Sequence, residues 1–140
     1  MLGLKTMNEV LFRKLERLKE EVIYLEKNKA KFLKTLQASA DIKKMAERSV
    51  YLCAEITLDI ADMVIAIKGL PKPSTYSDSI YKLGDYKIVP KSFARSIIYI
   101  AGLRNFLAHD YQIDTSDNLR RFLKSGLSDI KRFIGYIEKL

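Results

Sequence analysis

The chain has 140 residues, 48% of them hydrophobic, which is the size and composition of a single globular domain covering residues 1–140. Its one cysteine excludes an intramolecular disulfide and a zinc site built from several cysteines. The net charge of +8 suits a polyanionic partner such as RNA or an acidic protein, although the basic residues are spread out and an ordinary lysine-rich surface accounts for them equally well.

Helical periodicity dominates the N-terminal part of the chain. Apolar residues recur there at spacings of three and four: Leu11, Leu15, Leu18, Val22 and Leu25. This stripe predicts an amphipathic helix, for which Asn8 is a suitable N-cap. We expect the charged, asparagine-bearing stretch 27–29 to break or bend the chain.

A second helical region is predicted over residues 32–68. Ser39 or Asp41 would cap a break inside it, and Gly69 followed by Pro71 is typical of a helix end. The apolar pattern widens toward the C-terminal end of this region. Such a pattern indicates a central helix that is buried on more than one side.

Residues 69–90 are rich in turn-forming residues and predict a loop, with one short helix at 78–83 that stops at Gly84. Pro90 is well placed as the first residue of the next helix. We expect that helix to run without interruption to Arg104.

The C-terminal part predicts one more helix, capped by Asp114, Thr115 or Ser116. Strand-like alternation of useful length is absent from the sequence, so the expected fold class is all-α, an antiparallel up-and-down bundle of four to five helices. The longest apolar runs, such as residues 97–103, fall well short of the roughly 20 residues of a membrane-spanning helix. The N-terminal residues do not resemble a secretory signal, and we expect a cytoplasmic protein without a membrane partner.

The octapeptide of residues 104–111, Arg-Asn-Phe-Leu-Ala-His-Asp-Tyr, is the most informative stretch of the sequence. It holds the only histidine, His109, five positions after Arg104 and two before Tyr111. Histidine is both acid and base near neutral pH, and the planar fork of arginine fits a phosphate. Arg104 and His109 are therefore candidate catalytic residues for phosphodiester chemistry that needs no metal.

The spacing of these two residues constrains how they can work together. Positions five apart on a regular helix point about 140° away from each other. Arg104 and His109 can therefore converge only at a helix end, and the polar residues that follow favour an end near Ala108. RNA cleavage by the 2′-hydroxyl also needs both a base and an acid. A homodimer would bring two copies of the pair to one groove, whereas a monomer would have to recruit Asp110 or Tyr111, or use His109 twice.

Plainer interpretations of the same residues stay open. Arg104, His109 and Tyr111 can cap a helix end and pair with carboxylates. Asn105 can orient Arg104 or a phosphate, or can be an ordinary surface residue. Asp59, among the apolar residues of the central helix, can pair with Arg104, cap the helix or face solvent. A metal site at His109 is poorly supported, because the sequence has no second histidine and only one cysteine.

The octapeptide resembles the signature of the HEPN superfamily, and more closely the pattern Arg-Asn-x-Leu/Ile-x-His-x-Tyr of the HepT toxins. The matching positions are Arg104, Asn105, Leu107, His109 and Tyr111. The resemblance extends along nearly the whole chain and includes the segments 10–15, 46–49, 58–61, 69–71, 74–76 and 88–90.

This resemblance implies a helical-bundle ribonuclease that works as a homodimer, without a metal or other cofactor, and with its active groove between protomers. By analogy, Arg104 would act on the phosphate and His109 as acid and base. Asn105 and Asp59, from the reasoning on the residues above, are the candidate supporting residues. HepT toxins are encoded beside MNT antitoxins, small nucleotidyltransferases that transfer AMP from ATP to the motif tyrosine, here Tyr111. The added anion would repel and block RNA.

A second hypothesis belongs to another functional class. The chain could be a non-catalytic HEPN bundle that binds nucleotide or serves as the partner of a nucleotidyltransferase, with Arg104 and His109 holding the nucleotide phosphate. Cleavage of RNA by the purified protein would distinguish the two hypotheses.

Overall fold

The computed structural model describes residues 2–109 and 113–140, with side chains from residue 8 onward in these ranges. Its elements, in chain order, are α1 (Leu2–Thr35), α2 (Ala40–Ile67), α3 (Tyr76–Asp85), α4 (Lys91–Ser96), α5 (Tyr99–His109), α6 (Ser116–Arg121), the π-helical turn η1 (Phe122–Gly126) and α7 (Leu127–Glu138). The described ranges contain no strand.

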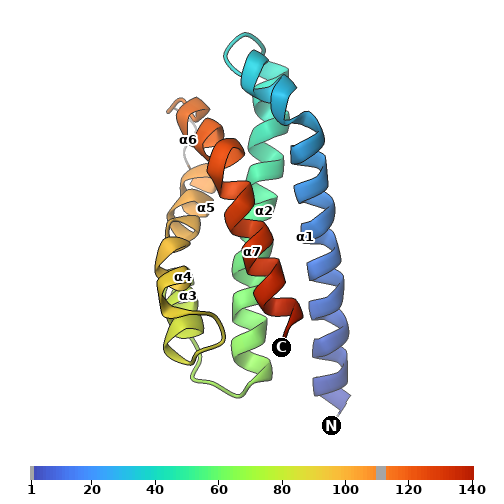
Figure 1. Cartoon of the computed structure of the whole chain (residues 1–140), viewed down its shortest axis with the longest axis vertical. Helices are drawn as coiled ribbons and strands as arrows, with labels where there is room; N and C mark the ends of the chain where they lie inside the picture. Colours follow the sequence, from blue (N-terminus) through green and yellow to red (C-terminus); the bar gives the residue numbers. More distant parts are fainter. Residues whose placement is uncertain (1, 110–112) are drawn as a thin grey trace.

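These elements form an antiparallel bundle of four rods (Figure 1). α1 and α2 are one long helix each, α3, α4 and α5 follow one another along a third rod, and α6, η1 and α7 make the fourth. α2 contacts α1, α3, α5, α6 and α7, so it is the central helix of the bundle. The predicted all-α fold and its multiply buried central helix are confirmed.

Two predictions for α1 are wrong. Asn8 lies inside the helix instead of capping it, and the charged stretch around Asn28 does not break it. The apolar stripe continues past that stretch to Phe32 and Leu36, which are completely or almost completely buried. Asn28 also donates its side-chain amide to the carbonyl of Tyr24 at 2.9 Å. Packing of a continuous apolar face therefore outweighs the weak helix propensity of one asparagine.

Both ends of α2 follow the predicted caps. Ser39 is the N-cap, and its hydroxyl accepts a backbone hydrogen bond of 3.2 Å from the first turn. At the other end, Gly69 adopts a φ of +67°. The N–H groups of Gly69 and Leu70 can then donate to the carbonyls of Ala66 and Ile65, which is the Schellman pattern.

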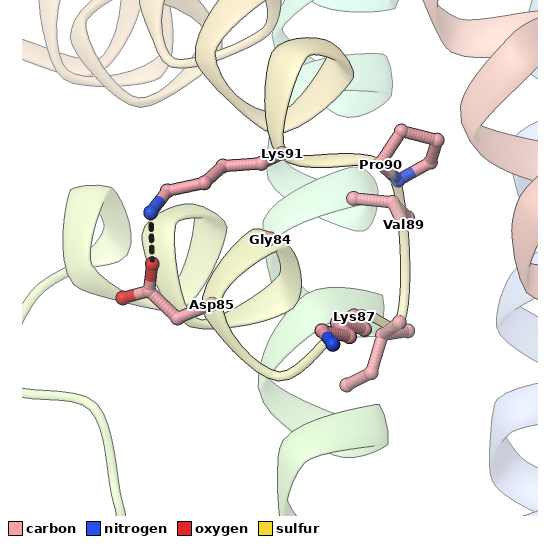
Figure 2. Close-up of a pocket in the computed structure, with 7 residues that line it drawn as sticks. Gly84, Asp85, Lys87, Val89, Pro90 and Lys91 are labelled. Carbon is pink, nitrogen blue, oxygen red and sulfur yellow. Dashed lines mark ion pairs between the residues drawn. The ribbon is translucent and has the colours of Figure 1, made fainter.

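The connection between α3 and α4 differs from the prediction. α3 continues through Gly84 to Asp85. α4 packs closely against Gly84, where a Cβ would lie 2.9 Å from the Cβ of Ala94. The chain turns instead at Lys87, whose φ is +58°. Figure 2 shows the hollow at this turn, where Lys91 reaches back to Asp85 at 3.8 Å. Gly84 therefore permits close helix packing and does not end the helix.

The helix expected to run unbroken from Pro90 to Arg104 is divided at residues 97–98. The N–H groups of Ile97 and Ile100 donate to carbonyls three residues earlier, at 3.2 and 3.1 Å, which is the tighter 3₁₀ pattern. Two adjacent β-branched isoleucines, which have reduced helix propensity, occupy the break. α5 is consequently a separate helix, and it carries residues 104–109 of the octapeptide.

The fourth rod begins as predicted, with Thr115 as the N-cap of α6 and Asp114 accepting a hydrogen bond of 3.1 Å from the backbone of Ser116. The π-helical turn that follows was not expected. A Cβ at Gly126 would lie 2.5 Å from a ring carbon of Phe122, so only glycine fits under this ring. Among the described residues, no helix is long and apolar enough to cross a bilayer.

Candidate functional site

Arg104 lies on α5 and is held by a carboxylate of the central helix. Its Nη2 and Nε donate to the same oxygen, Oε1 of Glu55, at 3.0 and 3.3 Å. The two side chains are only 19% and 25% exposed, so the ion pair is partly shielded from water. Burial on its own would raise the pKa of Glu55, but hydrogen bonds from Tyr51 and Arg104 outweigh it and lower that pKa. Glu55 is therefore a charged partner of Arg104 at neutral pH.

Two tyrosines and an asparagine complete the surroundings of Arg104. Its guanidinium carbon lies 5.2 Å from the ring centre of Tyr76 and 5.8 Å from that of Tyr51. The hydroxyl of Tyr51 donates to the second carboxylate oxygen of Glu55. Asn105 accepts a hydrogen bond of 3.2 Å from Nη1. These contacts come from α2, α3 and α5, and together they fix the plane of the guanidinium group.

Asp59 does not pair with Arg104, one of the alternatives that the sequence left open. It binds Lys14 of α1 at 3.4 Å instead. Burial is the main reason that the pKa of Asp59 is raised, even though Lys14 opposes it. Sequence reasoning missed Glu55, which stands four residues before Asp59 and thus on the same face of α2. A second charged residue in an apolar helix, one turn away from the first, was the available clue.

His109 is the last residue of α5 and is exposed. α5 is thus helical past Ala108, the predicted end, up to the last residue before the gap in the described ranges. Because α5 stays helical from Tyr99 to His109, the side chains of Arg104 and His109 leave the helix about 140° apart. Arg104 faces α2, and a single chain does not direct His109 to the same place. Tyr111 falls outside the described residues.

An open hollow lies beside this site, between α2 and the last turn of α5. It is lined by Lys44, Glu47, Arg48, Tyr51, Leu107 and Ala108. Its lining therefore reaches from the tyrosine next to Arg104 to the residue that precedes His109. The chain that follows the octapeptide is attached to the same part of α2, since Thr115 donates to Glu47 at 2.6 Å and Lys43 binds Asp114 at 2.8 Å.

Comparison with known proteins gives several consistent relatives. The family model described as "Ribonuclease HepT-like" matches residues 11–137. The mRNA nuclease HepT of Shewanella oneidensis is 25% identical in an alignment of length 137 that covers 94% of this chain and 98% of that protein. The tRNA nuclease HepT of Aphanizomenon flos-aquae is 30% identical over 74 residues, 53% of this chain and 50% of that protein.

Among solved structures, the chain resembles the tri-AMPylated HEPN toxin of Shewanella oneidensis in complex with its MNT antitoxin. The TM-score is 0.84 at 20% identity, and the match covers 94% of this chain and 98% of that one. At this identity the likeness shows the fold alone. The family model, however, spans most of the chain and includes the octapeptide from Arg104 to Tyr111. The chain therefore belongs to the HepT-like family.

Proposed function

We propose that this protein is the toxin of a HEPN/MNT toxin–antitoxin pair, a metal-independent endoribonuclease that acts as a homodimer. The observation that carries the proposal is the intact Arg-x4-His-x-Tyr octapeptide in the sequence, in a chain whose family model is described as ribonuclease HepT-like. The mRNA and tRNA nuclease activities in the names of its relatives support RNA as the substrate. The net charge of +8 agrees with such a polyanion.

The reaction requires groups that act on a phosphodiester. The 2′-oxygen attacks the phosphorus as a base takes its proton, and the bond from phosphorus to the 5′-oxygen breaks as an acid protonates that oxygen. The products are a 2′,3′-cyclic phosphate and a 5′-hydroxyl. Arg104 stabilises the charge on the phosphate, and His109 supplies the acid or base, since arginine does not deprotonate in proteins.

The arrangement of α5 supports two chains per groove. Each chain has one histidine, and it leaves the helix about 140° from Arg104. A two-fold axis near the end of α5 would supply two copies of His109, one as base and one as acid. Asn105 would keep Arg104 in its orientation, as its hydrogen bond does within the chain. Asp59 would support the site only indirectly, because its ion-pair partner is Lys14 and not Arg104.

The proposed inhibition places AMP on Tyr111. An MNT nucleotidyltransferase would catalyse attack of the phenolic oxygen on the α-phosphorus of ATP, with loss of the phenolic proton and departure of pyrophosphate. The phosphodiester formed carries a negative charge two residues from His109 and would repel RNA. One of the similar solved structures is described as a tri-AMPylated toxin in complex with an MNT antitoxin, which supports this part of the proposal.

The decisive experiment incubates the purified protein with transfer RNA and total RNA in EDTA, beside the variants His109→Ala and Arg104→Ala. Mass spectrometry first verifies that Tyr111 carries no AMP. We expect EDTA-resistant cutting that leaves cyclic phosphate ends and is lost in both folded variants. Absence of cutting by the unmodified wild type would favour the non-catalytic bundle, in which Arg104 and His109 bind a nucleotide phosphate.

A further inference from the structure

Arg48 of α2 carries a positive charge that forms no ion pair within the described ranges. Its side chain is exposed. Arg104, by contrast, is matched by Glu55 at 3.0 Å. The pair of Arg104 and Glu55 is neutral overall and attracts a polyanion weakly at long range. Arg48 therefore adds net positive charge at this part of the surface.

Tyr51 joins the two arginines into one cluster. The guanidinium carbons of Arg48 and Arg104 each lie 5.8 Å from the centre of its ring. The two groups are thus separated by at most twice that distance. Contact with an aromatic ring holds a guanidinium group in a defined place while leaving its N–H edge available for hydrogen bonds. Arg48 and Arg104 therefore both contact the ring of Tyr51.

The hollow next to Tyr51 extends from this cluster toward the last turn of α5. Besides Arg48 and Tyr51, its lining includes Lys44 and, from the last turn of α5, Leu107 and Ala108. An extended RNA strand that crosses this hollow would pass from Arg48 toward the end of α5, where His109 lies.

The hollow has one carboxylate, that of Glu47. It already accepts a hydrogen bond of 2.6 Å from Thr115, so part of its acceptor capacity is engaged inside the protein. The two cations of the lining, Lys44 and Arg48, leave a positive balance.

We propose that Arg48 is a second phosphate-binding residue, which holds the RNA backbone next to the phosphate that Arg104 contacts. The proposal rests on the ribonuclease function proposed above and names the site that binds the flanking nucleotide. Arg48 would contribute affinity and register, since phosphate contacts position a nucleic acid without reading its sequence. A planar fork suits this role better than a lysine, because it can bind two phosphate oxygens together.

The test measures binding of a fluorescent single-stranded RNA to Arg48→Ala by anisotropy over a range of salt concentrations. All proteins carry His109→Ala, so that the RNA stays intact. We expect Arg48→Ala to weaken binding roughly five- to tenfold, as for the loss of one charge-assisted contact. The slope of log Kd against log salt should shrink by about 0.7, the value for one phosphate contact with a single strand. Arg48→Lys should recover part of the affinity.

Arg95→Ala is the matched control, because Arg95 is exposed on α4 and its loss changes the net charge by the same amount. Equal binding by Arg48→Ala and Arg95→Ala would overturn the proposal, as would failure of the parent protein to bind RNA. So would a fall in sedimenting mass of Arg48→Ala, which would place Arg48 between protomers. Arg48-dependent binding without cutting by the wild type would refute the nuclease function alone.

Discussion

The ion pair between Glu55 and Arg104 should couple the two residues energetically, and a double-mutant cycle measures that coupling. Glu55→Gln removes the charge but keeps the size and a hydrogen-bonding group. Arg104→Met removes the guanidinium but keeps an unbranched apolar stem. Because methionine offers no new partner to Glu55, the cycle isolates the interaction between the native side chains.

The structure sets the expected size of the effect. Two hydrogen bonds, at 3.0 and 3.3 Å, join the side chains of Arg104 and Glu55, which are 19% and 25% exposed. In burial, this pair is intermediate between exposed and buried ion pairs. Exposed ion pairs contribute up to about 1 kcal/mol to stability, and disruption of a buried one costs about 3–5 kcal/mol. We expect each single variant to lower the free energy of unfolding by about 1–3 kcal/mol. The coupling energy should be about 1–2 kcal/mol.

Urea denaturation of the four proteins at one protein concentration provides the assay, since any dimer makes stability depend on concentration. A coupling energy below about 0.3 kcal/mol would mean that the two changes are additive and would refute the reasoning. Cleavage gives a separate readout. If Glu55 positions Arg104, Glu55→Gln should cut RNA more slowly while binding it as well as the wild type or better. A role limited to stability would leave the cutting rate of the folded variant unchanged.

The remaining predictions concern stability, pH and modification. Gly84→Ala should lower the free energy of unfolding by about 1–3 kcal/mol, because the added Cβ would lie 2.9 Å from that of Ala94. Gly102→Ala should raise the free energy of unfolding by about 0.5–1 kcal/mol, because its added Cβ meets no atom within 4 Å. Equal effects of the two variants in urea titrations would contradict this prediction. Because the folded pKa of Glu55 is lowered, its stabilisation is present above its unfolded value of about 4.3 and disappears as pH falls through the folded value. Glu55→Gln should therefore lower the free energy of unfolding by less at pH 3 than at pH 7. The same loss at both pH values would argue against a stabilising charge on Glu55. Tyr111→Phe should keep RNA cleavage but gain no AMP by mass spectrometry when incubated with ATP and an MNT nucleotidyltransferase; modification elsewhere with full inhibition would refute Tyr111 as the target.

The fold was predictable because its helices follow from local patterns. The caps at Ser39 and Gly69 and the wide apolar face of α2 are visible in the sequence, and all three are present in the structure. Two of the failures have a common physical cause in tertiary packing. α1 continues past Asn28 because its apolar stripe continues, and Gly84 serves the contact between α3 and α4. Neither effect is visible in a short window of sequence.

The site was predictable only in part. The octapeptide identified Arg104 and His109 by residue type and spacing, and their catalytic roles stay predictions. Glu55 and Arg48 could not be found in this way, because they lie on α2, about fifty residues earlier in the chain. Their proximity to Arg104 depends on how α2 and α5 pack. The sequence named Asp59 as a possible partner of Arg104. The rotation of α2 about its axis that directs Glu55 to Arg104 is set by the packing of the bundle.

The ion pair with Glu55 does not exclude a phosphate from Arg104. A guanidinium group has five N–H bonds, of which Glu55 takes one on Nε and one on Nη2, and Asn105 takes one on Nη1. One N–H therefore remains on each Nη, and two such donors can bind two phosphate oxygens. Arg104 can hold its place in the fold and a phosphate at once. A lysine has three N–H bonds on a single nitrogen and cannot satisfy Glu55, Asn105 and a bidentate phosphate together, so the proposed role of this position requires arginine.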